Sequence, residues 1–216
     1  MTKVPPHSPI TVTPKTGRIA GIVLLVAAVL IIIAMAHHPS GLEPGDTGIG
    51  MTLGGFIHAA MIVLLGANLW GLTIFSIRQT LGGWMLAGIV AYGISFAGNL
   101  MAALVNGFIV PAVATRVDHA ESGDLFILLW QSNQASAQLG IYASSGAFVF
   151  WSISLLSRKK VENLVIGSLG LIAAFVPSAA LYTALIALNV DGAFLAYGVQ
   201  AAWTGLVGLE MLRQKL

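Results

Sequence analysis

The chain contains no cysteine and very little charge. Of its 216 residues only 8% are Asp, Glu, Lys or Arg, whereas soluble domains carry about 25%. The absence of cysteine excludes a disulfide scaffold, thiolate metal ligands and a thiol nucleophile. The basic residues are scattered and the net charge is only +2. This excludes the clustered basic face of a nucleic-acid-binding domain, so we expect no nucleic-acid partner.

Long apolar runs take the place of the missing charge. The chain is 57% hydrophobic, and a helix needs about 20 mostly apolar residues to cross ~30 Å of hydrocarbon. Lipid offers the backbone no hydrogen-bond partners, so these runs must be helical. The sequence therefore predicts an all-α, polytopic integral membrane protein whose one domain, residues 19–213, is a six-transmembrane-helix bundle. The predicted spans are residues 19–36, 51–77, 84–109, 125–156, 164–188 and 194–212.

The positions of the basic residues predict the orientation of these spans. Cytoplasmic loops of membrane proteins are enriched in Lys and Arg. With the N-terminus inside, nine of the 10 bases are cytoplasmic and only Arg116 is outside. Both termini are then cytoplasmic, and residues 37–50, 110–124 and 189–192 form the outer loops. We expect a bacterial inner membrane with these loops on the periplasmic side.

The N-terminal region allows a second interpretation. Residues 1–18 contain four prolines among Ser, Thr and Lys, which predicts a disordered cytoplasmic tail. Lys15, Arg18 and the sequence Ala34-Met35-Ala36 around the first apolar run also resemble a secretory signal peptide that is cleaved after Ala36. The run is longer than the usual h-region of about 7–15 residues, which favours a retained span.

Uncharged polar residues gather in the outer half of the predicted bundle. The third span carries such residues at helical spacing, and the fourth carries a longer stripe that excludes Asn133. Polar residues inside a membrane line a cavity or contact a partner, so we expect an outer-facing pocket. Its predicted lining is His58, Tyr92, Ser95, Asn99, Asn106, Gln131, Gln134, Gln138, Tyr142 and Tyr182. The alternative is that the amides hydrogen-bond across helices and hold the bundle together.

Histidines and acids on the outer side form the candidate metal ligands. Imidazole with carboxylate suits Zn, Cu or Fe, although no recognised ligand spacing is present. Bis-histidine haem requires histidines on two facing spans, and only His58 lies within one, which argues against haem. The candidates are His37, His38, His58, Asp118, His119 and Glu121.

No sequence motif indicates catalysis. The chain has no Gly-x-Ser-x-Gly elbow, no phosphate-binding loop and no carboxylate pair within a span. We therefore favour a binding role, in which the outer-facing pocket holds a small ligand, a lipid headgroup or a metal for sensing, uptake or delivery. The first alternative is an accessory subunit that packs against a membrane-protein partner or a second copy. The second is a metal-dependent enzyme at the outer surface.

Overall fold

The computed structural model describes residues 12–38, 49–79, 82–114 and 122–214, and in these ranges it is all-α, as predicted. Six of its helical segments are long and apolar enough to cross a membrane, so the chain is an integral membrane protein. The elements are α1 (Pro14–Ala36), α2 (Ile49–Arg78), α3 (Gly83–Leu104), the π-helix η1 (Val105–Ile109), α4 (Val110–Ala114), α5 (Ser122–Leu156), α6 (Val161–Tyr182) and α7 (Val190–Leu212).

Helix α1 begins earlier than the sequence predicts. The Thr13 hydroxyl caps it by accepting a hydrogen bond of 3.1 Å from the Thr16 backbone nitrogen, and Pro14 occupies the first turn. Proline suits this position because its missing N–H has no partner there in any helix. Residues 14–18 are therefore helical, although the sequence predicted a disordered tail; residues 1–11 of that tail lie outside the described residues.

Helix α6 ends at Tyr182, before the predicted end of the fifth span at Leu188. Ala184 has a left-handed backbone with φ of 56°. The Ile186 N–H donates to the Ala180 carbonyl at 3.2 Å, which satisfies carbonyls that the helix end leaves unpaired. The residues that follow are still apolar, so hydropathy alone placed the boundary too late.

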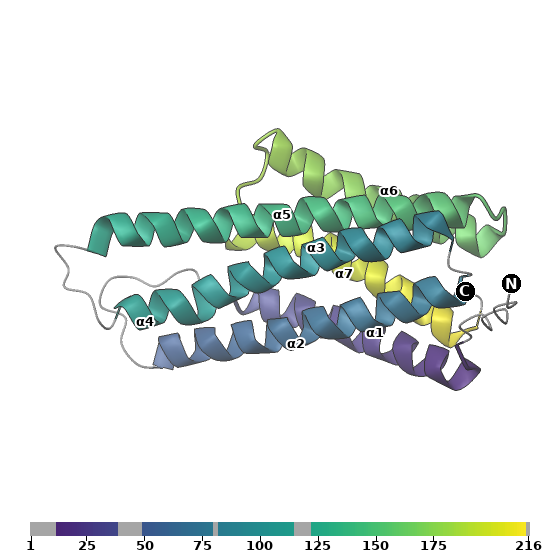
Figure 1. Cartoon of the computed structure of the whole chain (residues 1–216), viewed down its shortest axis with the longest axis horizontal. Coiled ribbons are helices and arrows are strands. Elements are labelled where there is room, and N and C mark those ends of the chain that lie inside the picture. Colours follow the sequence, from purple (N-terminus) through teal and green to yellow (C-terminus); the bar gives the residue numbers. More distant parts are fainter. Residues whose placement is uncertain (1–11, 39–48, 80–81, 115–121, 215–216) are drawn as a thin grey trace, which may run out of the picture.

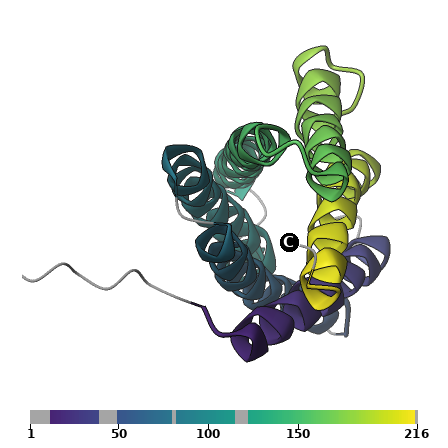
Figure 2. The same ribbon diagram turned by 90° about the vertical axis from the view of Figure 1, so that its right-hand side faces the viewer.

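The six long helices form a closed ring in chain order. Each packs against the next along the chain, and α7 closes the ring on α1. Neighbouring helices run antiparallel, so α1 starts where α7 ends (Figure 1). We call this end, at which α2 also finishes, the Arg78 end, and the opposite end the His38 end. Figure 2 shows the ring with the Arg78 end facing the viewer.

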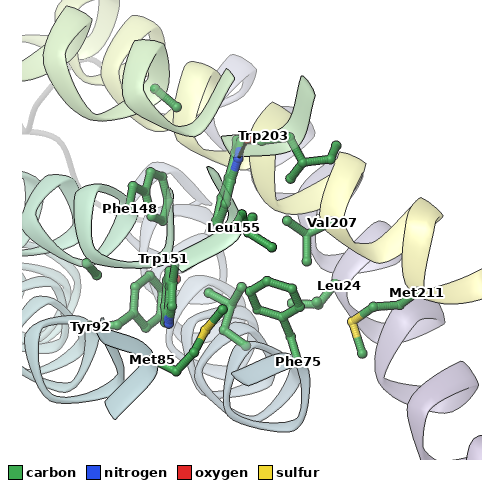
Figure 3. Packing of buried hydrophobic residues seen from close by; sticks show 14 of the residues in the cluster. Leu24, Phe75, Met85, Tyr92, Phe148, Trp151, Leu155, Trp203, Val207 and Met211 are labelled. Atoms are coloured by element: carbon green, nitrogen blue, oxygen red, sulfur yellow. Dashed lines mark hydrogen bonds between the residues drawn. The ribbon is translucent and has the colours of Figure 1, made fainter. Parts of the chain in front are cut away.

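An aromatic cluster fills the ring toward the Arg78 end. Trp151 and Trp203 stack with their ring centroids 6.0 Å apart, and Phe148 lies 4.5 Å from Trp203 (Figure 3). The Trp203 indole N–H donates to the Ile166 carbonyl at 2.9 Å. Dense packing of this kind is what stabilises helix association in lipid, where apolar transfer contributes little. The aromatic cluster therefore occupies one half of the ring, and a smaller apolar cluster that includes Ile31 and Met35 shares the other half with the polar residues.

Two glycines bring α1 and α7 into backbone contact. A Cβ on Gly21 would lie 2.8 Å from the Gly208 carbonyl oxygen, and a Cβ on Gly208 would lie 2.7 Å from the Gly21 carbonyl oxygen. The contact is therefore reciprocal, and neither position accepts a side chain without moving a helix. Small residues at such crossings are typical of membrane helix pairs.

We predict that Gly208→Val lowers the stability of the bundle. The added side chain must push α7 from α1, and overpacking of this kind costs about 1–3 kcal/mol. Thermal unfolding of the purified protein in detergent measures the effect. Gly93→Val is the matched control, because a Cβ at Gly93 meets nothing within 4 Å. Equal melting temperatures for the two variants would contradict the assigned contact.

Candidate ligand cavity

The half of the ring toward the His38 end contains a partly open cavity of about 480 Å³. Its walls come from α1, α2, α3 with η1, α5 and α7, together with the residues that lead into α7. Helix α6 contributes no lining residue and supports the wall from outside by packing on α5 and α7. Phe148 and Tyr92 line the cavity and also belong to the aromatic cluster, so this cluster forms its floor.

The cavity walls are mostly apolar, with polar groups at defined places. Ile31, Leu65 and Phe148 are typical of the apolar surface. Among the described lining residues there is no Lys or Arg, and Asp191 is the one acid. A largely apolar pocket with a few polar groups is the usual form of a small-molecule site. The lack of cationic side chains argues against an anionic occupant.

His58 and His38 contact each other at the His38 end of the cavity. The His58 side chain is 4% exposed, and its Nδ1 lies 2.7 Å from the Gly54 carbonyl oxygen. A carbonyl only accepts, so Nδ1 carries the proton and Nε2 is an acceptor in the neutral ring. The His38 Nε2 lies 3.1 Å from this Nε2 and donates to it. The backbone of α2 therefore fixes the tautomer of His58.

The π-helix η1 brings the end of α3 against His58. A Cβ on Gly107 would lie 2.4 Å from the His58 Cβ, so glycine is required at this approach. The neighbouring Asn106 points its Nδ2 at the His58 Nε2 over 3.4 Å. π-Helical segments occur often at functional sites, and this one widens the turn where α3 contacts the buried imidazole.

Asn99 connects three helices in the middle of the cavity. Its Oδ1 accepts a hydrogen bond of 2.7 Å from the Tyr197 hydroxyl on α7. Its Nδ2 donates to the Ser95 hydroxyl at 3.2 Å on α3. A Cβ on Gly140 of α5 would lie 2.2 Å from the Asn99 Oδ1. Glycine at this position therefore lets α5 pack directly on the amide.

A second polar network joins α5, α6 and α7. The Ser144 hydroxyl donates to the Gln200 Oε1 at 2.9 Å, and the Gln200 amide nitrogen donates to the Ser145 hydroxyl at 3.4 Å. Ser178 of α6 donates to the same Ser145 hydroxyl at 2.7 Å. Gln200 and Ser144 line the cavity, and their polar groups are already satisfied by one another. These residues act as the helix-connecting groups that the alternative interpretation of the sequence expected.

Asn68 differs from the other cavity amides. Its side chain is 3% exposed and lines the cavity. Its Oδ1 atom has no hydrogen-bond partner in the described structure. A buried acceptor without a partner costs about 1–3 kcal/mol.

Six of the ten predicted pocket residues line the cavity, and four do not. Those that line it are His58, Tyr92, Ser95, Asn99, Asn106 and Gln134. Gln131 and Gln138 are exposed, Tyr142 is 41% exposed and Tyr182 is 85% exposed. Tyr182 is the last residue of α6, which does not reach the cavity.

The predicted face of α5 is rotated relative to the one that lines the cavity. Asn133, which the predicted stripe excluded, lines the cavity together with Ala137 and Ser144. Gln134 belongs both to the predicted stripe and to the face that lines the cavity. Its amide nitrogen donates to the Leu188 carbonyl at 3.1 Å and so connects α5 to the segment before α7. Polarity alone misplaced the face because two of its amides are on the outside of the bundle.

Several cavity residues were absent from the predicted set. They are His38, which was predicted only as a metal ligand, and Asn68, Asn133, Ser144, Asn189, Asp191, Tyr197, Gln200 and Thr204. Three of them on α7, Tyr197, Gln200 and Thr204, follow one another at helical spacing of three and four, which is the signal that would have found them. Asn68 carries no such pattern, and the helix packing alone shows its place.

The predicted metal ligands do not form one carboxylate-containing group in the described structure. His37 is exposed, and its Nδ1 lies 2.9 Å from the Ile33 carbonyl, so it turns away from His58. Asp118, His119 and Glu121 lie outside the described residues. Within the described part of the chain, no three His, Cys, Asp or Glu side chains are grouped as a metal would require.

The fold and the cavity together define a six-span integral membrane protein with a partly open cavity between its helices. Comparison with protein-family models, with curated proteins and with solved structures finds no match. Any statement about function therefore depends on the side chains of the cavity.

We predict that Tyr197→Phe lowers the stability of the protein. The variant leaves the buried Asn99 Oδ1 without the donor that the Tyr197 hydroxyl supplies, which costs about 1–3 kcal/mol. Tyr142→Phe is the control, because the Tyr142 side chain is 41% exposed and its hydroxyl does not line the cavity. Thermal unfolding in detergent should separate the two variants by several degrees. A melting temperature of Tyr197→Phe equal to that of the control would exclude a structural role for this hydrogen bond.

Proposed function

We propose that the protein binds a small, neutral and mostly apolar molecule in the cavity. The observation that carries this proposal is the Asn68 Oδ1, a buried acceptor on the cavity wall without a partner. A ligand hydroxyl, amine or amide N–H placed against this oxygen removes the cost of leaving it unpaired. The remaining apolar wall then covers the body of the ligand.

The size of the cavity supports this proposal. A volume of about 480 Å³ falls within the range of roughly 300–1,000 Å³ typical of small-molecule sites. His58 and Asn68 are ten residues apart on α2, which corresponds to ~15 Å along the helix. Polar groups therefore lie at two levels of the α2 wall, with Asn99 among those on the other walls. A molecule with a polar group at each end, or one polar end and an apolar body, matches this layout.

The charge of the lining selects among ligands. An anionic lipid headgroup or a free phosphate requires Lys, Arg or a cluster of backbone donors, and no Lys or Arg is among the described lining residues. The cavity instead offers imidazole, phenol, hydroxyl and amide groups, which recognise neutral hydrogen-bonding molecules. We therefore place a neutral ligand ahead of the lipid headgroup that the sequence also allowed.

We further propose that the cavity lies toward the outer side of the membrane. Arg78, Arg158, Lys159, Lys160 and Arg213 all lie at the Arg78 end of the bundle. Basic residues favour the cytoplasmic side, so the His38 end, where the cavity lies, is the outer end. A cavity at that level can take up a ligand from outside or from the outer leaflet. This arrangement suits capture for sensing, uptake or delivery.

We expect that the protein purifies with a bound small molecule and that Ala102→Phe abolishes this binding. Ala102 lines the cavity, so a phenyl ring at this position occupies the space of the ligand. Ala97→Phe on the same helix is the control, because Ala97 is exposed on the outside of the bundle. Mass spectrometry of organic extracts from each purified protein measures the bound molecule.

The amount of small molecule bound per chain, compared between the natural protein and its variants, tests this prediction. About one equivalent per chain in the natural protein and in Ala97→Phe, with loss from Ala102→Phe, supports the proposal. Asn68→Leu keeps the branching and the number of heavy atoms of the side chain and removes the acceptor, so it should reduce the bound amount as well. Detection of nothing beyond lipid and detergent, or of equal amounts in Ala97→Phe and Ala102→Phe, would refute a ligand in this cavity.

We expect labelling of introduced cysteines to show the proposed orientation. The natural chain has no cysteine, so each single-cysteine variant reports one position. Asp191→Cys, at the start of α7, should react with a membrane-impermeant maleimide on intact cells. Lys160→Cys, just before α6, should react only after permeabilisation. The reverse pattern would place the cavity on the cytoplasmic side.

A further inference from the structure

Two histidines and two methionines line the cavity near the His38 end. His38, His58, Met35 and Met61 all line it. Met35 is 3% exposed, and Met61 packs against the same buried cluster to which Met35 belongs. We propose that these four side chains form a binding site for a copper(I) ion. This site uses side chains other than Asn68, so it goes beyond the proposed organic ligand and stands or fails separately.

The two helices contribute the ligands in equivalent pairs. Met35 and His38 are three residues apart at the end of α1, and His58 and Met61 are three residues apart on α2. Residues at this spacing lie on one face of a helix. The backbone N–H of His38 donates to the Met35 carbonyl at 3.2 Å, which extends this relation past the end of α1. The antiparallel helices α1 and α2 therefore present two imidazoles at one level and two thioethers one turn deeper.

The imidazole nitrogens are already close to the separation that a shared ion requires. Two nitrogens at ~2.0–2.1 Å from one tetrahedral ion are about 3.3 Å apart. The Nε2 atoms of His38 and His58 are 3.1 Å apart, whereas the ring centroids are 4.7 Å apart. The rings therefore direct these nitrogens toward each other. The separation of the two nitrogens already suits a shared ion. The rings must rotate so that both lone pairs point at an ion beside the line that joins the nitrogens.

His58 has the proton arrangement of a metal ligand. Its Nδ1–H donates to the Gly54 carbonyl at 2.7 Å, which leaves the Nε2 lone pair directed into the cavity. Metal-binding histidines almost always donate their second nitrogen to a carbonyl or carboxylate in this way. In the present arrangement the Asn106 Nδ2 and the His38 Nε2–H both point at that lone pair, so an ion must displace the Asn106 amide as well as the His38 proton. Binding of an ion requires this proton to move to the His38 Nδ1, with no change in the charge of the ring.

The ligand types select copper(I) over other ions. Thioether sulfur is a soft ligand that favours copper(I), and imidazole also suits copper. Zinc is usually held by thiolate, imidazole or carboxylate, and the described residues offer no cysteine and no acid in this group. Four neutral ligands in an apolar chamber also suit a single positive charge better than a double one, because burial of an uncompensated charge is costly.

We expect the full-length protein, purified in detergent, to bind one copper(I) per chain. The measurement is an anaerobic titration against the chromophoric copper(I) chelator bicinchoninate. Met61→Leu conserves volume and removes the thioether, so the affinity should fall at least about tenfold, an effect of the size seen when outer-shell partners of metal sites are lost. Met85→Leu is the matched control, because Met85 is fully buried in the aromatic cluster and does not line the cavity.

The double variant His38→Gln and His58→Gln measures copper held elsewhere on the chain. It should lose the tight site altogether, and X-ray absorption of the natural protein should show copper–sulfur scattering that Met61→Leu weakens. Equal affinities for Met61→Leu and Met85→Leu, or tight binding that persists in the double variant, would overturn the proposal. Zinc(II) bound as tightly as copper(I) and unaffected by Met61→Leu would overturn it as well. None of these results depends on the organic molecule measured in the extracts.

Discussion

The contact between Gly21 and Gly208 is the constraint on which the bundle depends. It joins the first helix to the last, and without it the six helices would form an open row. The backbones approach so closely that each glycine faces the carbonyl of the other. Because lipid supplies little apolar driving force between helices, association depends on close packing of this kind. Closure of the ring is what gives the molecule an interior.

The two halves of that interior have different contents. Toward the Arg78 end, Trp151 and Trp203 fill the ring with stacked aromatic side chains. Toward the His38 end, smaller side chains such as Ala102 and Ser95 leave a chamber of about 480 Å³. The polar groups around it are largely paired across helices, as in the contact between Asn99 and Tyr197. The walls are therefore held in place by their own hydrogen bonds, whereas the Asn68 oxygen has no partner among the described residues.

The sequence predicted the helical class and the number of spans because both depend on local composition. Hydropathy requires six apolar runs to be helical whatever their neighbours are. Helix ends depend on finer chemistry. The Thr13 cap extends α1 toward the N-terminus, and the left-handed Ala184 shortens α6. Neither signal changes the hydropathy of the segment, so both boundaries were misplaced.

The cavity was only partly predictable, because the rotation of a helix depends on its partners. The polar stripe of α3 faces inward, and the predicted residues on it line the cavity. On α5, Gln131 and Gln138 lie outside while Asn133 lies inside. Gly140 explains the difference, since it allows Asn99 to press against α5 and so determines which side of α5 faces α3. A glycine contact of this kind leaves no trace in the polarity pattern.

The pairing of His38 with His58 shows the same dependence on geometry. By sequence, His38 lies past the end of an apolar span and looks like a loop residue. In the structure, the last turn of α1 turns His37 outward to the Ile33 carbonyl and directs His38 to His58. Two adjacent histidines thus have opposite surroundings because one helix end separates them. The way α1 ends therefore determines which of the two histidines lines the cavity.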